Sequence, residues 1–265
     1  MVDKLLVAKI GGSIIDEERA LKEVLETFAA IPQRKALVHG GGRRADHVLE
    51  RMGIEPRMVG GRRITDAPTM DVVQMVYAGL VNKNIVALLQ SMDCPALGLS
   101  GADLDCLRAV KRPKGEVDFG FVGDIRLVNA RVLKQVLDAG WTPVFCPLTH
   151  DGRGQMLNTN ADTIAAEIAI ALGRFFSVEL VYCSGNMGVL ADPADEQSVL
   201  PTIGIEEYHS LKERGIISAG MIPKLDTAFR ALRNGVQEVR IGGSVALHAD
   251  NKATRIRLSN TEEKK

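Results

Sequence analysis

Two lysines stand where an unpaired charge would be unfavourable. The first, Lys9, interrupts an apolar run from Leu5 to Ile10 that ends at Gly11 and Gly12. A lysine in a buried strand is disfavoured unless its ammonium group meets an anion, and consecutive glycines leave backbone N–H groups accessible to a phosphate. The alternative is a strand end from which the lysine reaches solvent. No GxxxxGK[ST] loop is present, so the turn is not a Walker A motif.

The second lysine, Lys224, follows Gly220-Met-Ile-Pro223. Ser218 and Pro223 predict the start of a helix, which places Lys224 in its first turn. A cation at the positive end of a helix dipole is unfavourable by roughly 0.3–1 kcal/mol when exposed. A bound anion would offset that cost.

Three glycines follow His39 at an expected strand-to-helix junction. Glycine loses more chain entropy on ordering than any other residue, so some group should approach the backbone of Gly40, Gly41 and Gly42. Close packing between the helix and the strand is the alternative. Nothing in the sequence pairs His39 with a nucleophile, and we expect a histidine satisfied within the core.

Two further segments place polar side chains before expected helices. Arg63, in the sequence GRRIT, could hold a carboxylate with two parallel hydrogen bonds, although adjacent arginines in a loop are usually solvated. Asn158-Thr-Asn160-Ala-Asp162 opens a helix, where Asn and Asp commonly serve as caps. Together with the two lysines and the glycine turns, Asp162 suits phosphoryl transfer, in which catalysis is mostly positioning and charge neutralisation.

The elements that must position these residues alternate between short apolar runs and helical periodicity. Strand, glycine turn and helix in succession predict an α/β fold with a parallel sheet and helices on its faces. Residues 107–128 contain glycines and alternating apolar residues, and predict a hairpin that projects from the sheet. The clearest helices are expected at residues 18–30, 65–90 and 160–172, and the clearest strands at residues 5–10, 36–38 and 238–241.

Composition narrows the class of protein. The 265 residues carry 33 basic and 33 acidic side chains, and this zero net charge disfavours a nucleic-acid or membrane-surface partner. The four cysteines are too widely spaced for a zinc ribbon or a redox dithiol, so we expect reduced, packed thiols and no metal site. No signal peptide or run of about 20 uninterrupted apolar residues is present. We expect a soluble, cytoplasmic protein.

The motifs, in this order and spacing, resemble the amino acid kinase superfamily over nearly the whole chain. They are Lys9-x-Gly-Gly-Ser, His39-Gly-Gly-Gly, Gly61-x-Arg63-x-Thr65, Asn158-x-Asn-Ala-Asp162 and Gly220-Met-Ile-x-Lys224. Carbamate kinase, aspartokinase and UMP kinase share the glycine turns. The arginine before the long helix, together with the NxNAD run, is most similar to the acylglutamate kinases.

The resemblance implies a three-layer α/β/α sandwich around a mainly parallel sheet, divided into two lobes. Residues 1–174 would bind the amino acid and form a homodimer, residues 175–258 would bind ATP, and residues 259–265 would be a polar tail. The implied reaction is ATP-dependent phosphorylation of the γ-carboxylate of N-acetylglutamate, or of a related N-acylglutamate, in arginine biosynthesis. That carboxylate is already ionised at pH 7, since its pKa is about 4.3, and it needs no general base.

The resemblance also implies a role for each motif residue. Lys9 and Lys224 would neutralise the phosphoryl group in transit, and Asp162 would orient both ammonium groups. Gly41 and Gly42 would offer N–H groups to the phosphate and substrate, and Arg63 and Asn158 would hold the α-carboxylate side of the substrate. ATP, carrying Mg²⁺, would contact Gly11, Gly12, Gly185, Asn186, Gly188, Leu190, Ile216, Ile217 and Ser218.

The sequence departs from the family pattern in two places. Gly185 stands where many relatives carry Asp, which bears on nucleotide binding. The run from Lys111 to Lys114 is more basic than an acetyl group requires, and it suits a larger, acidic acyl group such as succinyl unless it is simply a solvated loop. Another small-acid kinase and a non-catalytic nucleotide- or arginine-binding protein are the alternative functions.

Assembly can also be anticipated. The helix expected at residues 65–90 carries an apolar stripe that needs the core or a second copy to cover it, and we expect a homodimer. Arginine-inhibited members of the resembled family carry an extra helix before the first strand. Only Met1 to Lys4 precede Leu5 here, so we expect no inhibition by arginine.

Overall fold

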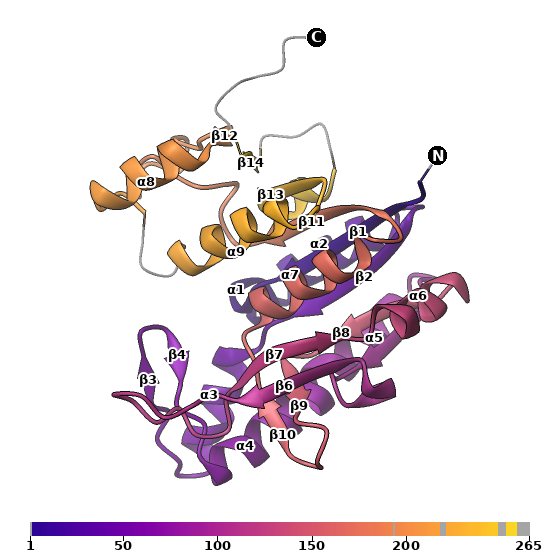
Figure 1. Cartoon of the computed structure of the whole chain (residues 1–265), viewed down its shortest axis with the longest axis vertical. Helices are drawn as coiled ribbons and strands as arrows, with labels where there is room; N and C mark the ends of the chain where they lie inside the picture. Colours follow the sequence, from indigo (N-terminus) through magenta and orange to yellow (C-terminus); the bar gives the residue numbers. More distant parts are fainter. Residues whose placement is uncertain (1, 193, 218–220, 249–252, 259–265) are drawn as a thin grey trace.

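The computed structural model describes residues 2–192, 194–217, 221–248 and 253–258 (Figure 1). Three of the expectations above therefore lie outside the described residues. They concern Ser218, Gly220 and the tail at residues 259–265.

The centre of the molecule is an eight-stranded sheet. Six of the seven pairings between neighbouring strands are parallel. In β1 every residue from Leu5 to Ile10 is buried, as expected for an apolar strand with neighbours on both sides. Only β13 and β14 pair antiparallel. The strand order is β12 (Thr202–Ile203), β14 (Thr254–Ile256), β13 (Glu238–Gly242), β11 (Ser177–Cys183), β1 (Lys4–Ile10), β2 (Arg34–His39), β8 (Thr142–Phe145) and β5 (Ala96–Leu99).

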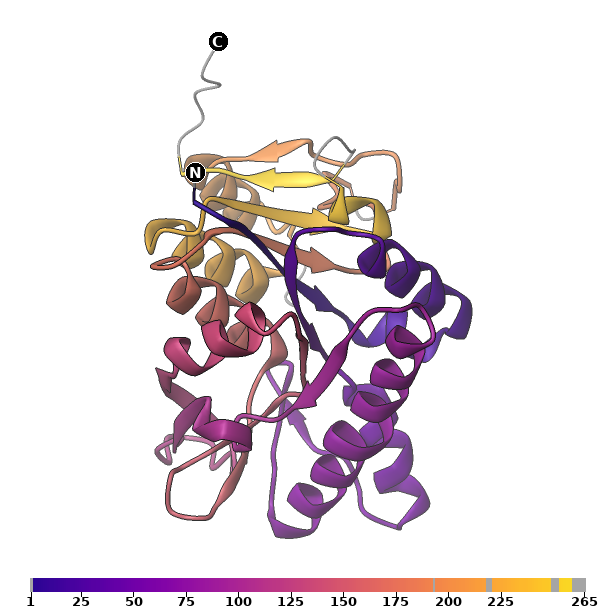
Figure 2. The ribbon, with the colours of Figure 1, turned by 90° about the vertical axis from the view of Figure 1, so that its right-hand side faces the viewer.

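Helices cover both faces of this sheet, and Figure 2 shows the strands between the two helical layers. One layer contains α6 (Ala130–Asp138), α7 (Ala161–Leu172) and α9 (Ile222–Arg233), with α8 (Ile205–Glu213) beside α9. The other contains α1 (Gly12–Asp16), α2 (Glu18–Ala29), α3 (Gly42–Arg51), α4 (Ala67–Gln74) and α5 (Asn82–Gln90). The predicted three-layer α/β/α fold around a mainly parallel sheet is confirmed.

The long helix between residues 67 and 90 contains an irregularity that periodicity did not reveal. It is capped by Asp66, whose side chain accepts a hydrogen bond from the Thr69 N–H, and Pro68 lies in its first turn. Between α4 and α5 the backbone adopts a π-helix, η1 (Met75–Val81). Such segments carry an extra residue per turn and often lie at functional sites.

The same run, Ala67–Gln90, is long and apolar enough to cross a membrane by length and composition alone, with a mean hydropathy of 1.5. That test is weak, because a helix in the core of a soluble protein also passes it. Here Asp71 and Lys83 interrupt the run, and its apolar residues pack against α2, α3 and β5.

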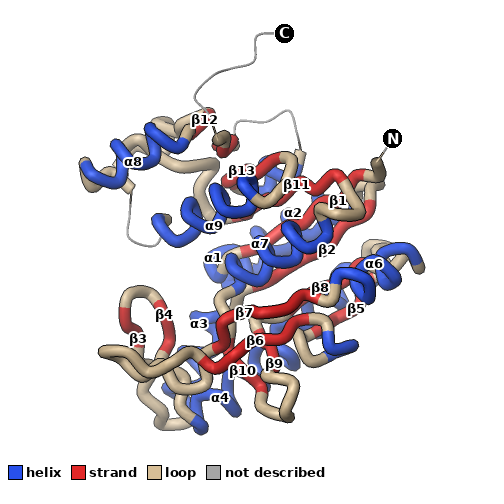
Figure 3. The backbone as a smooth tube through the Cα atoms, viewed as in Figure 1, coloured by secondary structure: helices blue, strands red, loops and turns tan. Residues whose placement is uncertain are grey.

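The hairpin predicted at residues 107–128 is confirmed, and it belongs to a second, smaller sheet (Figure 3). The strand order of this sheet is β10 (Met156–Asn158), β9 (Leu148–His150), β6 (Leu107–Lys111) and β7 (Gly123–Val128). A separate hairpin is formed by β3 (Met58–Val59) and β4 (Arg62–Arg63). Two 3₁₀ turns, η2 (Asp103–Asp105) and η3 (Ser244–Leu247), complete the described elements.

The main sheet crosses the predicted lobe boundary at residue 174 without a break, since β1 pairs with β11 along all seven of its residues. Two apolar clusters pack on its opposite faces. The four cysteines are buried and free, as predicted. The division of labour between two lobes stays a prediction.

A buried polar bridge ties α5 to the sheet at the glycine turn. The Asn82 side chain donates to the Val144 carbonyl at 2.9 Å and lies 3.1 Å from His39 Nε2. The His39 ring is fully buried, and its Nδ1 lies 2.7 Å from the Gly40 carbonyl. Burial lowers the pKa of His39 to about 4, so the ring is neutral at pH 7, which agrees with the expected core histidine.

This buried histidine predicts acid sensitivity. As pH falls below about 6.5, unfolded His39 gains a proton that the folded ring accepts only near pH 4. The contribution of neutral His39 to stability is therefore present in full well above pH 6.5, and on the order of 2–3 kcal/mol of unfolding free energy should be lost by pH 4.5. Urea unfolding at both pH values should show a smaller loss for His39→Gln than for the wild type. His47→Gln, at an exposed histidine, should behave like the wild type, and equal losses in all three proteins would contradict this account.

Candidate functional site

Three charged side chains meet where the carboxyl end of β1 faces the first turns of α7 and α9. Asp162 Oδ1 lies 2.9 Å from Lys9 Nζ and 3.3 Å from Lys224 Nζ. The side chains of both lysines are 10% exposed and that of Asp162 is 18% exposed, so the pairing is largely shielded from solvent. The contacts agree with the family resemblance, which implied that Asp162 orients both ammonium groups.

The electrostatics of this cluster favour an incoming anion. Burial by itself raises the pKa of Asp162, but the two ammonium groups outweigh burial and hold it at about 2. Burial, followed by the nearby Lys9 charge, lowers the pKa of Lys224. One carboxylate thus serves two cations, and the cluster carries a net charge of about +1 when all three groups are ionised.

Local sequence explains why these groups face one another. Asn160 caps α7 by accepting from the Thr163 N–H at 3.0 Å, which makes it the ordinary helix cap. Asp162 therefore does not cap α7 and lies in the first turn of that helix. Pro223 lies in the first turn of α9, whose start places Lys224 directly beside Asp162. The carboxyl ends of parallel strands are the usual place for ligands in such sheets.

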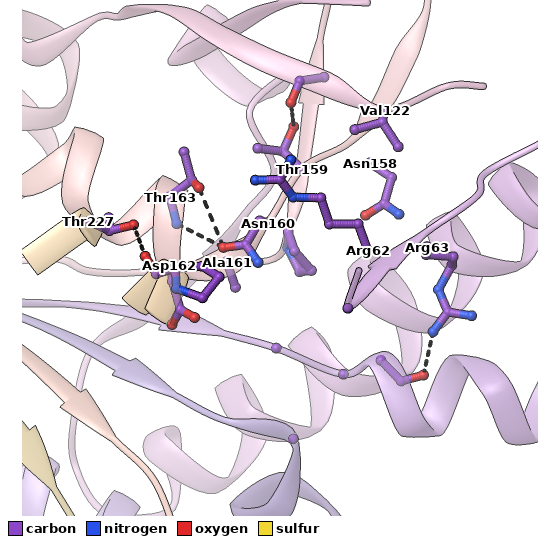
Figure 4. Close-up of a pocket in the computed structure, with 18 of the residues that line it drawn as sticks. Arg62, Arg63, Val122, Asn158, Thr159, Asn160, Ala161, Asp162, Thr163 and Thr227 are labelled. Carbon is purple, nitrogen blue, oxygen red and sulfur yellow. Dashed lines mark hydrogen bonds between the residues drawn. The ribbon is translucent and has the colours of Figure 1, made fainter. Parts of the chain in front are cut away.

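A cavity of about 720 Å³ opens beside the cluster. Lys9 and Asp162 belong to its lining, and so does the glycine turn at Gly40 to Gly42. Residues of the second sheet and of the β3–β4 hairpin complete the wall, as Figure 4 shows in part. Its volume is in the range of small-molecule pockets.

The two arginines of the GRRIT segment point in different directions. The Arg63 guanidinium turns toward α3, where it binds the Asp46 carboxylate and donates to the Gly42 carbonyl at 3.1 Å. Arg62 is exposed and extends across the cavity toward Thr159 and Asn160 (Figure 4). Arg62 forms no ion pair within the described part of the chain, whereas Arg63 is paired with Asp46. The sequence singled out Arg63 and missed Arg62, although both lay in the same motif.

The remaining predicted substrate residues are also in the cavity wall. The Asn158 amide donates to Thr65 Oγ1 at 2.9 Å, which fixes its orientation. Gly41 has φ +146°, a conformation that favours glycine, and a Cβ there would lie 3.2 Å from Tyr77 Cδ1. Tyr77, from the π-helix, thus packs directly against the turn. The close approach that the three glycines predicted is an aromatic ring of the protein itself.

Only one residue of the basic run at residues 111–114 lines this cavity. Arg112 lies in the wall and pairs with Asp124, and its buried Nη1 has no hydrogen-bond partner among the described residues. Lys111 lies over the Phe121 ring at 4.3 Å, and Lys114 pairs with Asp118 on the surface. The solvated-loop interpretation therefore fits Lys114 and not Arg112.

A second, smaller cavity of about 100 Å³ is lined by five of the residues predicted to contact ATP, namely Asn186, Gly188, Leu190, Ile216 and Ile217. Its lining is Asn186, Gly188, Val189, Leu190, Ile216, Ile217 and Met221. Gly185 lies beside the first glycine turn, since a Cβ on it would be 3.4 Å from Ser13 Oγ. The segment at Gly185 thus lies beside the turn that contains Ser13, and its contact with ATP stays a prediction.

Comparison with known proteins gives a consistent result. The model of the amino acid kinase family matches residues 4–243. An acetylglutamate kinase of Bacteroides thetaiotaomicron is 54% identical over 257 residues, covering 97% of this chain and 100% of that protein. An acetylglutamate kinase of Bacteroides fragilis is 52% identical over 257 residues, covering 97% and 98%.

Among solved structures, the smu.665 protein of Streptococcus mutans superposes with a TM-score of 0.81 at 26% sequence identity. The match covers 96% of this chain and 99% of that one. The similarity therefore extends over nearly the whole length of both chains.

The charge balance of the cluster predicts that removing Asp162 and removing Lys224 change stability by very different amounts. Asp162→Ala leaves two buried ammonium groups without their carboxylate, and should lower the free energy of unfolding by about 3 kcal/mol. Lys224→Met leaves a balanced Lys9–Asp162 pair, and should be within about 1 kcal/mol of the wild type or more stable. Chemical unfolding measures both, with Lys134→Met on the surface of α6 as a control expected to change stability by less than about 1 kcal/mol. Equal losses for the Asp162 and Lys224 variants would refute the charge argument.

Proposed function

The chain belongs to the amino acid kinase family, and we propose that it is a carboxyl-accepting kinase of arginine biosynthesis that phosphorylates N-acetylglutamate with ATP. The observation that carries the proposal is the meeting of Lys9, Asp162 and Lys224 beside a cavity that Lys9 and Asp162 line and that is large enough for an acylated amino acid. A net positive, preorganised cluster is what a transferring phosphoryl group requires.

The chemistry needs few participants. A γ-carboxylate oxygen of the substrate attacks the γ-phosphorus of ATP, an acyl phosphate forms, and ADP leaves with the electron pair of the broken P–O bond. The carboxylate is ionised at pH 7, so no side chain has to remove a proton. The neutral His39 is occupied by Asn82 and Gly40, which agrees with a mechanism that uses no histidine base.

We assign the large cavity to the amino acid and the small cavity to the nucleotide base and ribose. Supporting this division, the cluster lies beside both cavities: Lys9 and Asp162 line the large one, and at the start of α9 Pro223 lines the large cavity while Met221 lines the small one. Gly11 and Gly12 would then contact the ATP phosphates, and Gly41 and Gly42 the transferred phosphate and the substrate. Asn158 and Arg63 would hold the α-carboxylate side, with Arg63 acting from its position against Asp46.

We propose that Mg²⁺ enters with ATP. Within the described ranges, no three His, Cys, Asp or Glu side chains gather in a way that could hold a metal ion. Mg²⁺ is commonly bound through substrate phosphates and water with few protein ligands, which fits this residue set. When bound, it would neutralise charge on the nucleotide phosphates, while the two lysines act on the group in transit.

N-succinylglutamate is a second candidate substrate, and one observation favours it. Among the described residues, Arg62 extends across the cavity without an ion-pair partner, and Arg112 offers a buried Nη1 that has no hydrogen-bond acceptor. An acetyl group would present no charge to these guanidinium groups, whereas a succinyl group would end in a carboxylate that arginine can hold bidentately. The names of the similar kinases favour the acetyl compound.

We also propose a homodimer. The π-helix presents Met75, 55% exposed, and Leu80, 47% exposed, on the outer side of the long helix. Large apolar side chains so exposed on one helix are often covered by a second copy in a symmetric interface. Light scattering at the mass of two chains would support this assembly, and a mass of one chain would refute it.

The decisive test of the function is a hydroxamate-trapping assay with ATP and a panel of N-acyl amino acids. The wild type should form an acyl phosphate from an N-acylglutamate. Lys224→Met should lower kcat by at least about 10²–10³-fold, because it removes a cation from the transferring group. Circular dichroism and unfolding should confirm that the variant is folded. A wild type that binds ATP but forms no hydroxamate with any member of the panel would identify a binding protein instead.

Arg62 separates the two candidate substrates. If its guanidinium holds a second carboxylate, Arg62→Met should raise the KM for N-succinylglutamate at least about tenfold, since a charged hydrogen bond is lost. The KM for N-acetylglutamate and for ATP should change much less. Arg43→Met is a control, because Arg43 is also exposed at the edge of the same cavity. Equal changes for both acyl groups would remove Arg62 from acyl recognition.

A further inference from the structure

Tyr182 lies beneath the charged cluster and has no role in the reaction as described so far. It is the residue on β11 that pairs in register with Lys9 on β1. Register partners on neighbouring parallel strands direct their side chains to the same face of the sheet. Tyr182 therefore shares with Lys9 the face that α7 and α9 cover, and it is fully buried there.

One ring contacts both of the other members of the cluster. The Tyr182 hydroxyl donates to the Asp162 backbone carbonyl in the first turn of α7 at 3.3 Å. Lys224 Nζ, from the first turn of α9, lies 5.1 Å from the centre of the Tyr182 ring. At that distance the negative face of an aromatic ring attracts a cation.

We propose that Tyr182 is a positioning residue for phosphoryl transfer, whose ring holds the Lys224 ammonium group and whose hydroxyl holds the start of α7. The inference rests on the proposed function, because it assumes that Lys224 acts on the transferring group. Asp162 is shared by two lysines, so Lys224 has only half of a counter-charge. The ring supplies a second attraction that does not compete with Lys9 for the carboxylate.

The surroundings of Lys224 indicate what loss of the ring would change. Burial and the Lys9 charge from β1 lower the pKa of Lys224, while the Asp162 charge from α7 raises it. Cys183, also on β11, is a neutral thiol at pH 7, since burial raises its pKa to about 12. Burial raises the pKa of Tyr182 well above its ordinary value, so the ring stays neutral as well. Without the ring, Lys224 should lose its proton at a lower pH.

The test compares variants at position 182 in the full chain. Tyr182→Phe keeps the ring and removes the hydroxyl, and should lower kcat by about threefold. Tyr182→Met removes the ring, and should lower kcat at least about tenfold with little change in either KM. It should also move the alkaline limb of the kcat–pH profile down by about half to one pH unit.

Phe176→Leu is the matched control, because Phe176 is a buried aromatic residue of the same apolar cluster that precedes β11 at its other end. It should lose stability and keep the wild-type kcat and pH profile. Pentafluorophenylalanine at position 182 covers the case in which Tyr182→Met does not fold. It has nearly the shape of phenylalanine but a ring face that no longer attracts cations, so its profile should shift relative to Tyr182→Phe.

The outcomes separate the inference from the function on which it rests. A wild type without phosphoryl transfer would overturn the proposed function before any variant is compared. If the wild type is active, either of two results would overturn the role of Tyr182 and leave the proposed function intact. In the first, Tyr182→Met has the same kcat and pH profile as Phe176→Leu. In the second, phenylalanine and pentafluorophenylalanine at position 182 give identical pH profiles.

Discussion

The structure depends on one carboxylate, Asp162, that neutralises the two buried ammonium groups of Lys9 and Lys224. Asp162 lies within 3.3 Å of both lysine nitrogens, and none of the three side chains is more than 18% exposed. Two ammonium groups beside the same carboxylate repel each other, and the shared negative charge of Asp162 is what makes their burial tolerable. The strand and helices that carry them must therefore be held in place by everything around them. The apolar clusters on both faces of the sheet do this.

The fold solves this problem by bringing together elements that end or begin at the same edge. β1 ends at Ile10, and α7 and α9 begin at Ala161 and Ile222, so all three side chains extend from rigid elements and none from a loop. The arrangement is not the most stable one available, because a cation at the start of α9 opposes the helix dipole. Imperfect stability at this position is what a site for a transient anion requires.

Much of this site could be predicted from the sequence because its residues lie in short motifs. Local features drew attention to Lys9, Asp162 and Lys224, as a lysine in an apolar run and charged residues at helix starts, but their roles came from the resemblance to a known family. The pairing of Arg63 with Asp46 could not be found in this way, because it depends on how the β3–β4 hairpin folds back on α3. Tyr182 was hidden for a related reason. A tyrosine within VELVYC indicates only a buried strand until the register with Lys9 is known.

The π-helix between α4 and α5 has a consequence for how this chain tolerates changes in length. A π-helix bonds residue i to residue i+5, so it takes one more residue than an α-helix to complete the same rotation, and it absorbs an inserted residue without rotating the helices on either side. Removing one residue from Met75–Val81, with Tyr77 kept, would therefore return this segment to α-helical winding and leave the faces of α4 and α5 nearly unchanged. The same deletion within α4 or α5 would turn one part of the long helix by about 100° relative to the other, because an α-helix advances by that angle per residue. The place at which the long helix loses a residue thus decides whether Tyr77 stays against Gly41.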